Sequence, residues 1–104
     1  MSSIRLCGRD DLASGAARRF DVDGHRIALV RIADDFYAIG DRCSHADYSL
    51  AEGDVYERER EIECWKHGSM FSLETGQPQS LPATQSVPVY AVSMKDDDVM
   101  VELP

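Results

Sequence analysis

Three observations predict an all-β domain, either a small antiparallel β-sandwich or a small barrel. Short apolar runs recur along the chain with turns about every 8–12 residues, as in both architectures. Asp23 and Gly24 stand between two of these runs, and a two-residue hairpin loop needs positive φ at both positions, which this pair tolerates. Residues 9–17 hold the only candidate for a helical turn, and Ser14 and Gly15 weaken it.

The predicted strands alternate with turns that are rich in Gly, Asp and Glu. An acidic turn at residues 33–35 follows the first hairpin, and another turn at 74–76 follows a later strand. The three aspartates at 96–98 belong to the tip of the last hairpin, which we expect to be a solvated turn. The predicted strands are residues 4–7, 18–22, 26–32, 36–39, 61–63, 70–73, 87–94 and 99–103.

The length and charge of the chain limit what it can be. Its 104 residues leave no room for a second core of ordinary size, so we expect one domain over residues 1–104. The net charge of −8 argues against binding to nucleic acid or an anionic membrane, because both need a basic surface. Because the chain has no apolar run of the roughly 18 residues that span a membrane and no signal-peptide core, we expect a soluble, cytoplasmic protein.

Two loops break the strand pattern, and each carries one cysteine and one histidine. The first contains Cys43-x-His45 and the second contains Cys64-x-x-His67. The chain has three cysteines, an odd number, whereas a disulfide framework uses an even one. In a reducing compartment cysteines more often bind metal, react or pack in a core, so the two loops form the candidate functional site.

Two thiolates and two imidazoles suit two kinds of metal centre. Structural zinc accepts such a set in a tetrahedron, and a [2Fe–2S] cluster of the Rieske type takes two Cys and two His, with both His on one iron. Zinc sites generally take two ligands of one kind from a short turn, such as Cys-x-x-Cys, whereas each loop here offers one Cys and one His. The spacing therefore favours a binuclear cluster over zinc. A nucleophilic Cys–His pair would explain only one loop, and unrelated polar residues would need the same coincidence twice.

The two loops resemble the cluster-binding motifs of the Rieske proteins. The resemblance implies an antiparallel β-sandwich with two cluster-binding loops at one end and one [2Fe–2S] cluster per chain. It implies that Cys43 and Cys64 hold one iron, and that His45 and His67 hold the other, near solvent. The residues that carry it are Cys43-Ser44-His45-Ala46-Asp47, Leu50-Ala51-Glu52-Gly53, Cys64-Trp65-Lys66-His67-Gly68-Ser69 and Phe71-Ser72-Leu73-Glu74-Thr75-Gly76.

The chain departs from the respiratory Rieske proteins in two respects. Those proteins join their loops by a disulfide, and the matching positions here are Tyr48 and Lys66, so we expect none. They also place a Tyr hydroxyl on a ligand sulfur, where this chain has Phe71, although Ser69 keeps the matching serine. A donor to sulfur raises the reduction potential. With one donor missing and many carboxylates nearby, we expect a potential near the low end of the Rieske range, roughly −150 to +300 mV.

The resemblance implies a one-electron carrier and not an enzyme. Rieske oxygenases hold a mononuclear iron on two His and a carboxylate in a second domain, and only His25 is left once the two loop histidines are assigned. The implied role is that of the ferredoxin of an aromatic-ring-hydroxylating dioxygenase, which passes electrons from a flavin-containing ferredoxin reductase to the terminal oxygenase. We expect a monomer that docks to both partners transiently. The alternatives are a small subunit of a nitrite reductase, an accessory of iron–sulfur cluster assembly and a zinc-binding interaction module.

Residues outside the four expected ligands also carry predictions. We expect Trp65 either to shield the cluster or to contact a partner. Cys7 is expected to be a small buried hydrophobe, and His25 a surface residue. The alternating charges of residues 57–61 predict a solvated hairpin tip. Charged residues near the loops, among them Asp41, predict a local surface of mixed charge.

Overall fold

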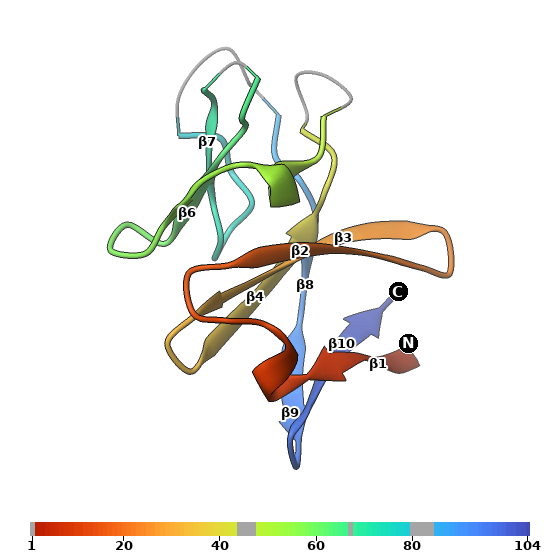
Figure 1. Ribbon diagram of the computed structural model, residues 1–104. Coiled ribbons are helices and arrows are strands. Elements are labelled where there is room, and N and C mark those ends of the chain that lie inside the picture. Colours follow the sequence, from red (N-terminus) through yellow and green to blue (C-terminus); the bar gives the residue numbers. More distant parts are fainter. Residues whose placement is uncertain (1, 44–47, 67, 80–84) are drawn as a thin grey trace.

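Three antiparallel sheets form the computed structural model of the chain, which describes residues 2–43, 48–66, 68–79 and 85–104. A four-stranded sheet lies in the middle, with a three-stranded sheet on either side (Figure 1). The prediction of an all-β antiparallel fold is confirmed. Among the described residues, the helix is limited to two short 3-10 turns, and none of it is long and apolar enough to cross a membrane.

The strands are connected as two sheets of three and one of four. The central sheet has the order β2 (Ala17–Val22), β3 (His25–Ile32), β4 (Asp35–Gly40) and β8 (Val89–Tyr90). The lower sheet in Figure 1 has the order β1 (Ser2–Gly8), β10 (Asp98–Leu103) and β9 (Val92–Lys95). The upper sheet has the order β5 (Val55–Tyr56), β6 (Glu61–Glu63) and β7 (Met70–Ser72). The 3-10 turns are η1 (Arg9–Asp11) and η2 (Leu50–Glu52).

The hairpin between β2 and β3 forms where the sequence predicts it. Val22 pairs with His25, so Asp23 and Gly24 alone make the loop. Their φ angles are 47° and 81°, which is the left-handed conformation that a two-residue loop requires at both positions.

β3 is buried on both faces and separates two hydrophobic cores. Side chains alternate between the faces of a strand, so neighbouring residues of β3 enter different cores. The upper core contains Ala28, Val30, Ile32, Ile39, Cys43, Leu50, Ile62, Cys64, Phe71, Leu73 and Val87. The lower core contains Leu6, Cys7, Leu12, Ile27, Leu29, Ala38, Val99, Val101 and Leu103. Two of the three cysteines therefore lie in one core and the third, Cys7, in the other, where the sequence predicts a buried hydrophobe.

The last predicted strand, residues 87–94, is two strands in the structure. β8 pairs with β4 in the central sheet, and β9 pairs with β10 in the lower sheet, with Ala91 between them. The chain thus changes sheets within one apolar run. Periodicity cannot show this change, because both pieces are extended and carry similar residues.

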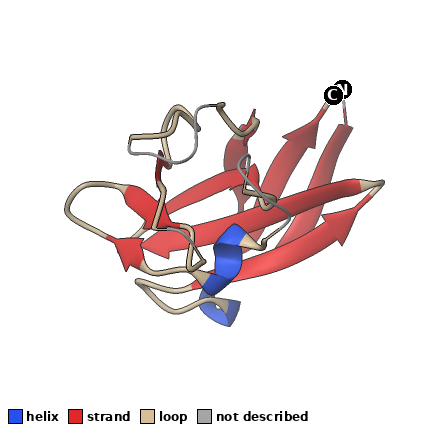
Figure 2. Cartoon of the chain, turned by 90° about the horizontal axis from the view of Figure 1, so that it is seen from above, coloured by secondary structure: helices blue, strands red, loops and turns tan. Residues whose placement is uncertain are grey.

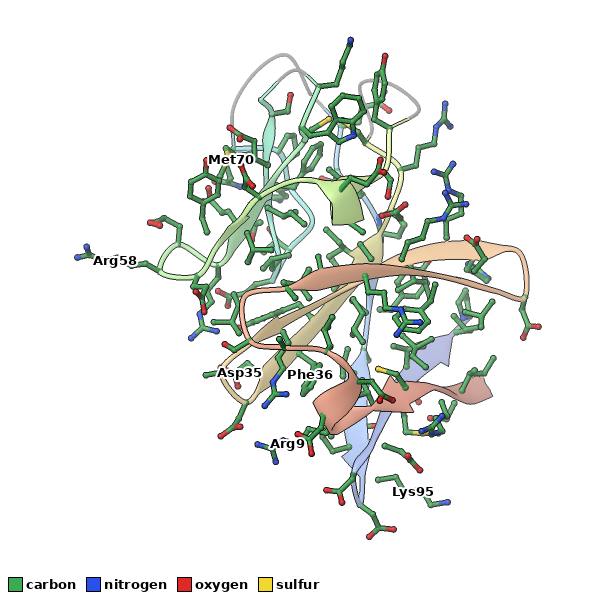
Figure 3. All side chains as sticks on the ribbon, in the orientation of Figure 1. Arg9, Asp35, Phe36, Arg58, Met70 and Lys95 are labelled. Atoms are coloured by element: carbon green, nitrogen blue, oxygen red, sulfur yellow. The ribbon has the colours of Figure 1, made fainter. Side chains whose placement is uncertain are left out.

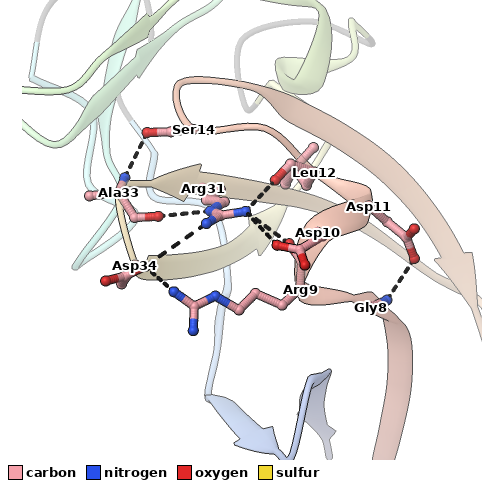
Figure 4. A network of polar contacts seen from close by, with 9 residues as sticks. All are labelled: Gly8, Arg9, Asp10, Asp11, Leu12, Ser14, Arg31, Ala33 and Asp34. Carbon is pink, nitrogen blue, oxygen red and sulfur yellow. Dashed lines mark hydrogen bonds and ion pairs between the residues drawn. The ribbon is translucent and has the colours of Figure 1, made fainter.

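The predicted helical turn at residues 9–17 shrinks to η1, residues 12–16 are irregular, and Ala17 already begins β2. Arg31 on β3 contacts this segment through two of its carbonyl groups, those of Arg9 and Leu12. Its guanidinium donates to the backbone oxygens of Ala33, Arg9 and Leu12 at 2.7, 3.0 and 2.9 Å (Figure 4). The Arg31 backbone adds two hydrogen bonds to the same segment, because its carbonyl accepts from the Gly15 amide and its amide donates to the Ala16 carbonyl.

The hairpin tip that the alternating charges of residues 57–61 predict is present in the structure. β5 and β6 form a hairpin whose tip carries Arg58, which points away from the molecule (Figure 3). This confirms the hairpin predicted at residues 57–61.

The two ends of the chain lie side by side, because Ser2 of β1 pairs with Leu103 of β10 (Figure 2).

Candidate metal centre

The first loop leaves the central sheet after β4, and its two described ends pair with each other. Arg42 and Ser49 form an antiparallel bridge, and the Cys43 amide donates to the Tyr48 carbonyl at 2.9 Å. The Cys43 side chain is 1% exposed and points into the upper core. The backbone pairing of the two ends of the loop therefore fixes the direction in which the Cys43 thiol points.

Asp41 closes the base of the first loop. Its amide donates to the Arg26 carbonyl on β3, and its own carbonyl accepts from the Leu50 amide at 2.6 Å. Its carboxylate accepts from Ser49 Oγ at 2.6 Å and from the Ala51 amide at 2.9 Å. One residue thus ties the outgoing strand, the returning strand and η2 together.

The Asp41 carboxylate is completely buried, which corrects the expectation of a surface charge. A buried carboxylate needs hydrogen bonds and opposite charge to offset its lost hydration. Arg19 Nε and Arg26 Nη2 each lie 3.8 Å from its Oδ2, one from β2 and one from β3. No sequence pattern near Asp41 could reveal this site, because both arginines come from other strands.

The second loop joins β6 to β7 in a tight turn. The Cys64 amide donates to the Ser69 carbonyl at 2.7 Å, and the Gly68 amide donates to the Cys64 carbonyl at 2.9 Å. Gly68 has a φ of 76°, which favours glycine. Cys64 is fully buried, in the same core as Cys43, and neither forms a disulfide.

Gly53 allows the backbone that follows the first loop to approach the backbone that precedes the second. A Cβ atom at this position would lie 1.6 Å from the Glu63 carbonyl oxygen, so only glycine allows this approach. Glu63 directly precedes Cys64, and its amide donates to the Asp54 carbonyl at 2.9 Å. The end of the first loop is therefore pressed against the start of the second. The sequence motif contains this glycine, but nothing in the motif predicts the close approach.

An aromatic contact joins the outer parts of the loops. Tyr48 of the first loop and Trp65 of the second pack edge to face, with ring centroids 5.1 Å apart and an interplanar angle of 82°. Lys66 Nζ lies 5.9 Å from the centroid of each ring. Tyr48 and Lys66 occupy the positions for which the sequence predicts no disulfide, and the described cysteines are free.

Ser69 and Phe71, which the resemblance places near the cluster, are both fully buried. Phe71 pairs with Ile62 across β6 and β7 and belongs to the upper core with both cysteines. A phenyl ring has no hydrogen-bond donor, so no side-chain donor reaches a sulfur from this position.

Two of the four expected ligands, His45 and His67, lie outside the described residues. His25, expected at the surface, is half-buried, and its Nδ1 lies 3.2 Å from the Tyr90 hydroxyl. It starts β3 at the hairpin with β2, and no contact joins it to the two loops among the described side chains.

Comparison with known proteins identifies the family to which this pair of loops belongs. The profile of the Rieske [2Fe-2S] domain matches residues 2–91. The chain belongs to this family. As a Rieske domain it binds one [2Fe–2S] cluster. Two buried, free thiols on paired loops fit the cysteine half of such a cluster's donor set.

Relatives of the same length are named as ferredoxins. The chain is 38% identical over 104 residues to the 3-phenylpropionate/cinnamic acid dioxygenase ferredoxin subunit of Shigella boydii serotype 4 (strain Sb227), covering 100% of this chain and 96% of that one. It is 35% identical over 103 residues to the ferredoxin component of biphenyl 2,3-dioxygenase from Rhodococcus jostii (strain RHA1), covering 99% and 94%.

Solved structures give the same picture of this Rieske domain. The ferredoxin of carbazole 1,9a-dioxygenase from Nocardioides aromaticivorans IC177 superposes with a TM-score of 0.94 at 36% identity, over 97% of each chain. A putative nitrite reductase small subunit from Mycobacterium tuberculosis superposes with a TM-score of 0.86 over 96% of this chain and 93% of that one, but at 24% identity. The latter likeness shows the fold alone.

Proposed function

We propose that this Rieske protein is a one-electron carrier, the ferredoxin of an aromatic-ring-hydroxylating dioxygenase. It accepts electrons from a flavin-containing ferredoxin reductase and passes them to the terminal oxygenase. The observation that carries the proposal is the end-to-end match to dioxygenase ferredoxin subunits. A solved complex of oxygenase and ferredoxin from carbazole 1,9a-dioxygenase contains a ferredoxin 36% identical to this chain, with a TM-score of 0.88.

The proposed ligands are Cys43 and Cys64 on one iron and His45 and His67 on the other. The bound cluster supplies reversible exchange of one electron. The two cysteines are supported by their burial in one core and by the backbone bonds that orient each loop. The two histidines are supported by their spacing from these cysteines in the motifs.

The protein residues around the ligands control how easily an electron is added. Phe71 is buried beside the two cysteines and offers no hydrogen bond to a sulfur. The missing donor disfavours added negative charge. We therefore propose a reduction potential near the low end of the Rieske range, which suits an acceptor of electrons from a flavin.

The carrier acts in the cytoplasm as a single domain and a monomer that docks and releases. Electron-transfer encounters use small interfaces, under roughly 1,200 Å² in total. The exposed aromatic area is modest: Trp65 is 49% exposed and Tyr56 39%. A permanent subunit of a larger enzyme would need a wider apolar face.

Reconstitution tests the proposal. A dioxygenase and a reductase of this class are mixed with an aromatic substrate, with and without the carrier, and NADH oxidation coupled to product is measured. We expect product formation only when the carrier is present and no product with Cys64→Ser. Cys7→Ser is the matched control, because that cysteine is also buried but lies in the lower core. Equal product formation without the carrier would contradict the proposal.

The alternative from the sequence is the small subunit of a nitrite reductase, although the solved small subunits share only the fold with this chain, at 24% identity. Size-exclusion chromatography of the protein from its native host distinguishes the two. A ferredoxin elutes alone, whereas a small subunit elutes with its enzyme.

A further inference from the structure

We propose that Tyr48, Trp65 and Lys66 form a clasp that holds the two cluster loops together and slows the loss of iron. They are positioning residues that act on the loops and not ligands. The proposal rests on the proposed function only in that the protein holds a [2Fe–2S] cluster between these loops. It adds a role for three residues that the ligand set does not use.

The clasp crosses the gap between segments that no other aromatic contact joins among the described side chains. Tyr48 lies opposite Cys43 in the first loop, where its carbonyl accepts from the cysteine amide. Trp65 directly follows Cys64 in the second loop. The edge-to-face contact of these rings at 5.1 Å therefore links the backbones that carry the two thiols.

The geometry is that of an attractive contact. Aromatic pairs prefer edge-to-face packing with centroids about 4.5–7 Å apart, and this pair has an interplanar angle of 82°. Lys66 Nζ, at 5.9 Å from both ring centroids, lies within the range of about 6 Å for a cation–π contact. The ammonium thus contacts its own loop and the opposite loop at once.

The rest of the scaffold holds the bases of the loops but leaves their outer parts to the clasp. Asp41 and Gly53 act below the cysteines, at the ends of β4 and β6. Tyr48 is half-buried, whereas Trp65 and Lys66 are exposed. Separation of these side chains would let water and chelators reach the ligands without unfolding either core.

The test uses the cluster-loaded protein and two readouts that need no partner. The first is the rate of iron release to a ferrous or ferric chelator, followed as loss of visible absorbance. The second is acrylamide quenching of fluorescence, which reports on one site because Trp65 is the only tryptophan. Far-UV circular dichroism checks that the sheets are intact.

Tyr48→Leu should release iron roughly three- to tenfold faster than the wild type, as loss of an aromatic pair implies, and should increase quenching of Trp65. Tyr48→Phe keeps the ring and should restore both values. Tyr90→Leu is the matched control, since Tyr90 is half-buried like Tyr48 and also packs edge to face, but on His25 and against the lower core. It should change neither value.

Lys66→Met and Lys66→Arg keep the test valid if Tyr48→Leu fails to fold, because Lys66 is exposed. The methionine variant should release iron about twofold faster, and the arginine variant should behave like the wild type. Wild-type iron release in both Tyr48→Leu and Lys66→Met would overturn the proposal, as would equal release from Tyr48→Leu and Tyr48→Phe. Failure of the reconstituted electron-transfer assay would contradict the proposed function but would leave these two readouts unaffected.

Discussion

The two cores on either side of β3 are similar in composition but closed in different ways. The lower core is covered by β1, β9 and β10, whose long ladders leave Cys7 in a continuous apolar interior. The upper core is covered by short strands and by two loops, each of which turns a cysteine inward. Burial is therefore common to all three cysteines, and only the loop setting distinguishes the two proposed ligands from Cys7.

The same contrast holds for the charged groups that anchor irregular segments. Arg31 ties the segment after β1 to the central sheet through two carbonyl groups, those of Arg9 and Leu12 (Figure 4). Asp41 ties the first loop to the same sheet through a hydroxyl, an amide and two arginines. The first anchors a segment of the lower half of the fold, whereas the second sets the path of a loop that carries a proposed ligand.

Substitution of the cysteines should give the largest difference between the cores. Cys64→Ser should abolish cluster binding, because serine oxygen is a poor substitute for thiolate on iron. Cys7→Ser should keep the cluster and lose only about 1–2 kcal/mol of stability from burying a hydroxyl. Iron and acid-labile sulfide per chain measure the outcome. Cluster loss in Cys7→Ser and not in Cys64→Ser would reverse the assignment.

Gly53→Ala should be the next most severe change. Its Cβ would overlap the Glu63 carbonyl at 1.6 Å, so the loops must separate at a cost of about 3 kcal/mol. We expect a large loss of bound iron. Gly24→Ala is the control, because nothing lies within 4 Å of a Cβ there and the cost of its positive φ is only about 1 kcal/mol. Similar iron content in the two variants would show that the close approach does not matter.

Asp41→Ala and Arg31→Met should separate loop anchoring from fold anchoring. Removal of the buried Asp41 carboxylate leaves the half-buried Ser49 hydroxyl and Ala51 amide without this acceptor, at a cost of about 3 kcal/mol. Arg31→Met removes three hydrogen bonds to carbonyls, at about 2 kcal/mol. We expect faster iron release only in Asp41→Ala, although denaturant midpoints fall in both. Faster release in Arg31→Met as well would indicate that general stability controls the cluster.

The smallest expected effect concerns alkaline stability and the lower core. Burial raises the pKa of the Cys7 thiol above its ordinary value of 9.0. The unfolded chain therefore loses this proton at lower pH than the folded chain, so stability is full below about pH 9 and declines as the pH rises through that range. Denaturation curves at about pH 8 and pH 10 should show a smaller decline for Cys7→Ala. An equal decline would mean that Cys7 does not contribute.

Features encoded by neighbouring residues could be predicted from the sequence, and features made by distant ones could not. The Asp23-Gly24 hairpin and the two Cys–His loops depend on local conformation and spacing, so they are visible in a single chain. The burial of Asp41 depends on Arg19 and Arg26 from other strands. The crossing at Ala91 depends on which sheet each half of an apolar run joins. Such tertiary choices leave no periodic signal.

The most direct test of the central claim is pulsed EPR of the reduced protein grown with ¹⁵N-labelled histidine. The account predicts a paramagnetic cluster coupled to nitrogen from two histidines, with the coupling unchanged in His25→Ala and altered in His67→Cys. A reduced cluster without histidine nitrogen coupling would contradict the ligand set. A colourless protein that binds a single zinc ion would contradict the cluster itself.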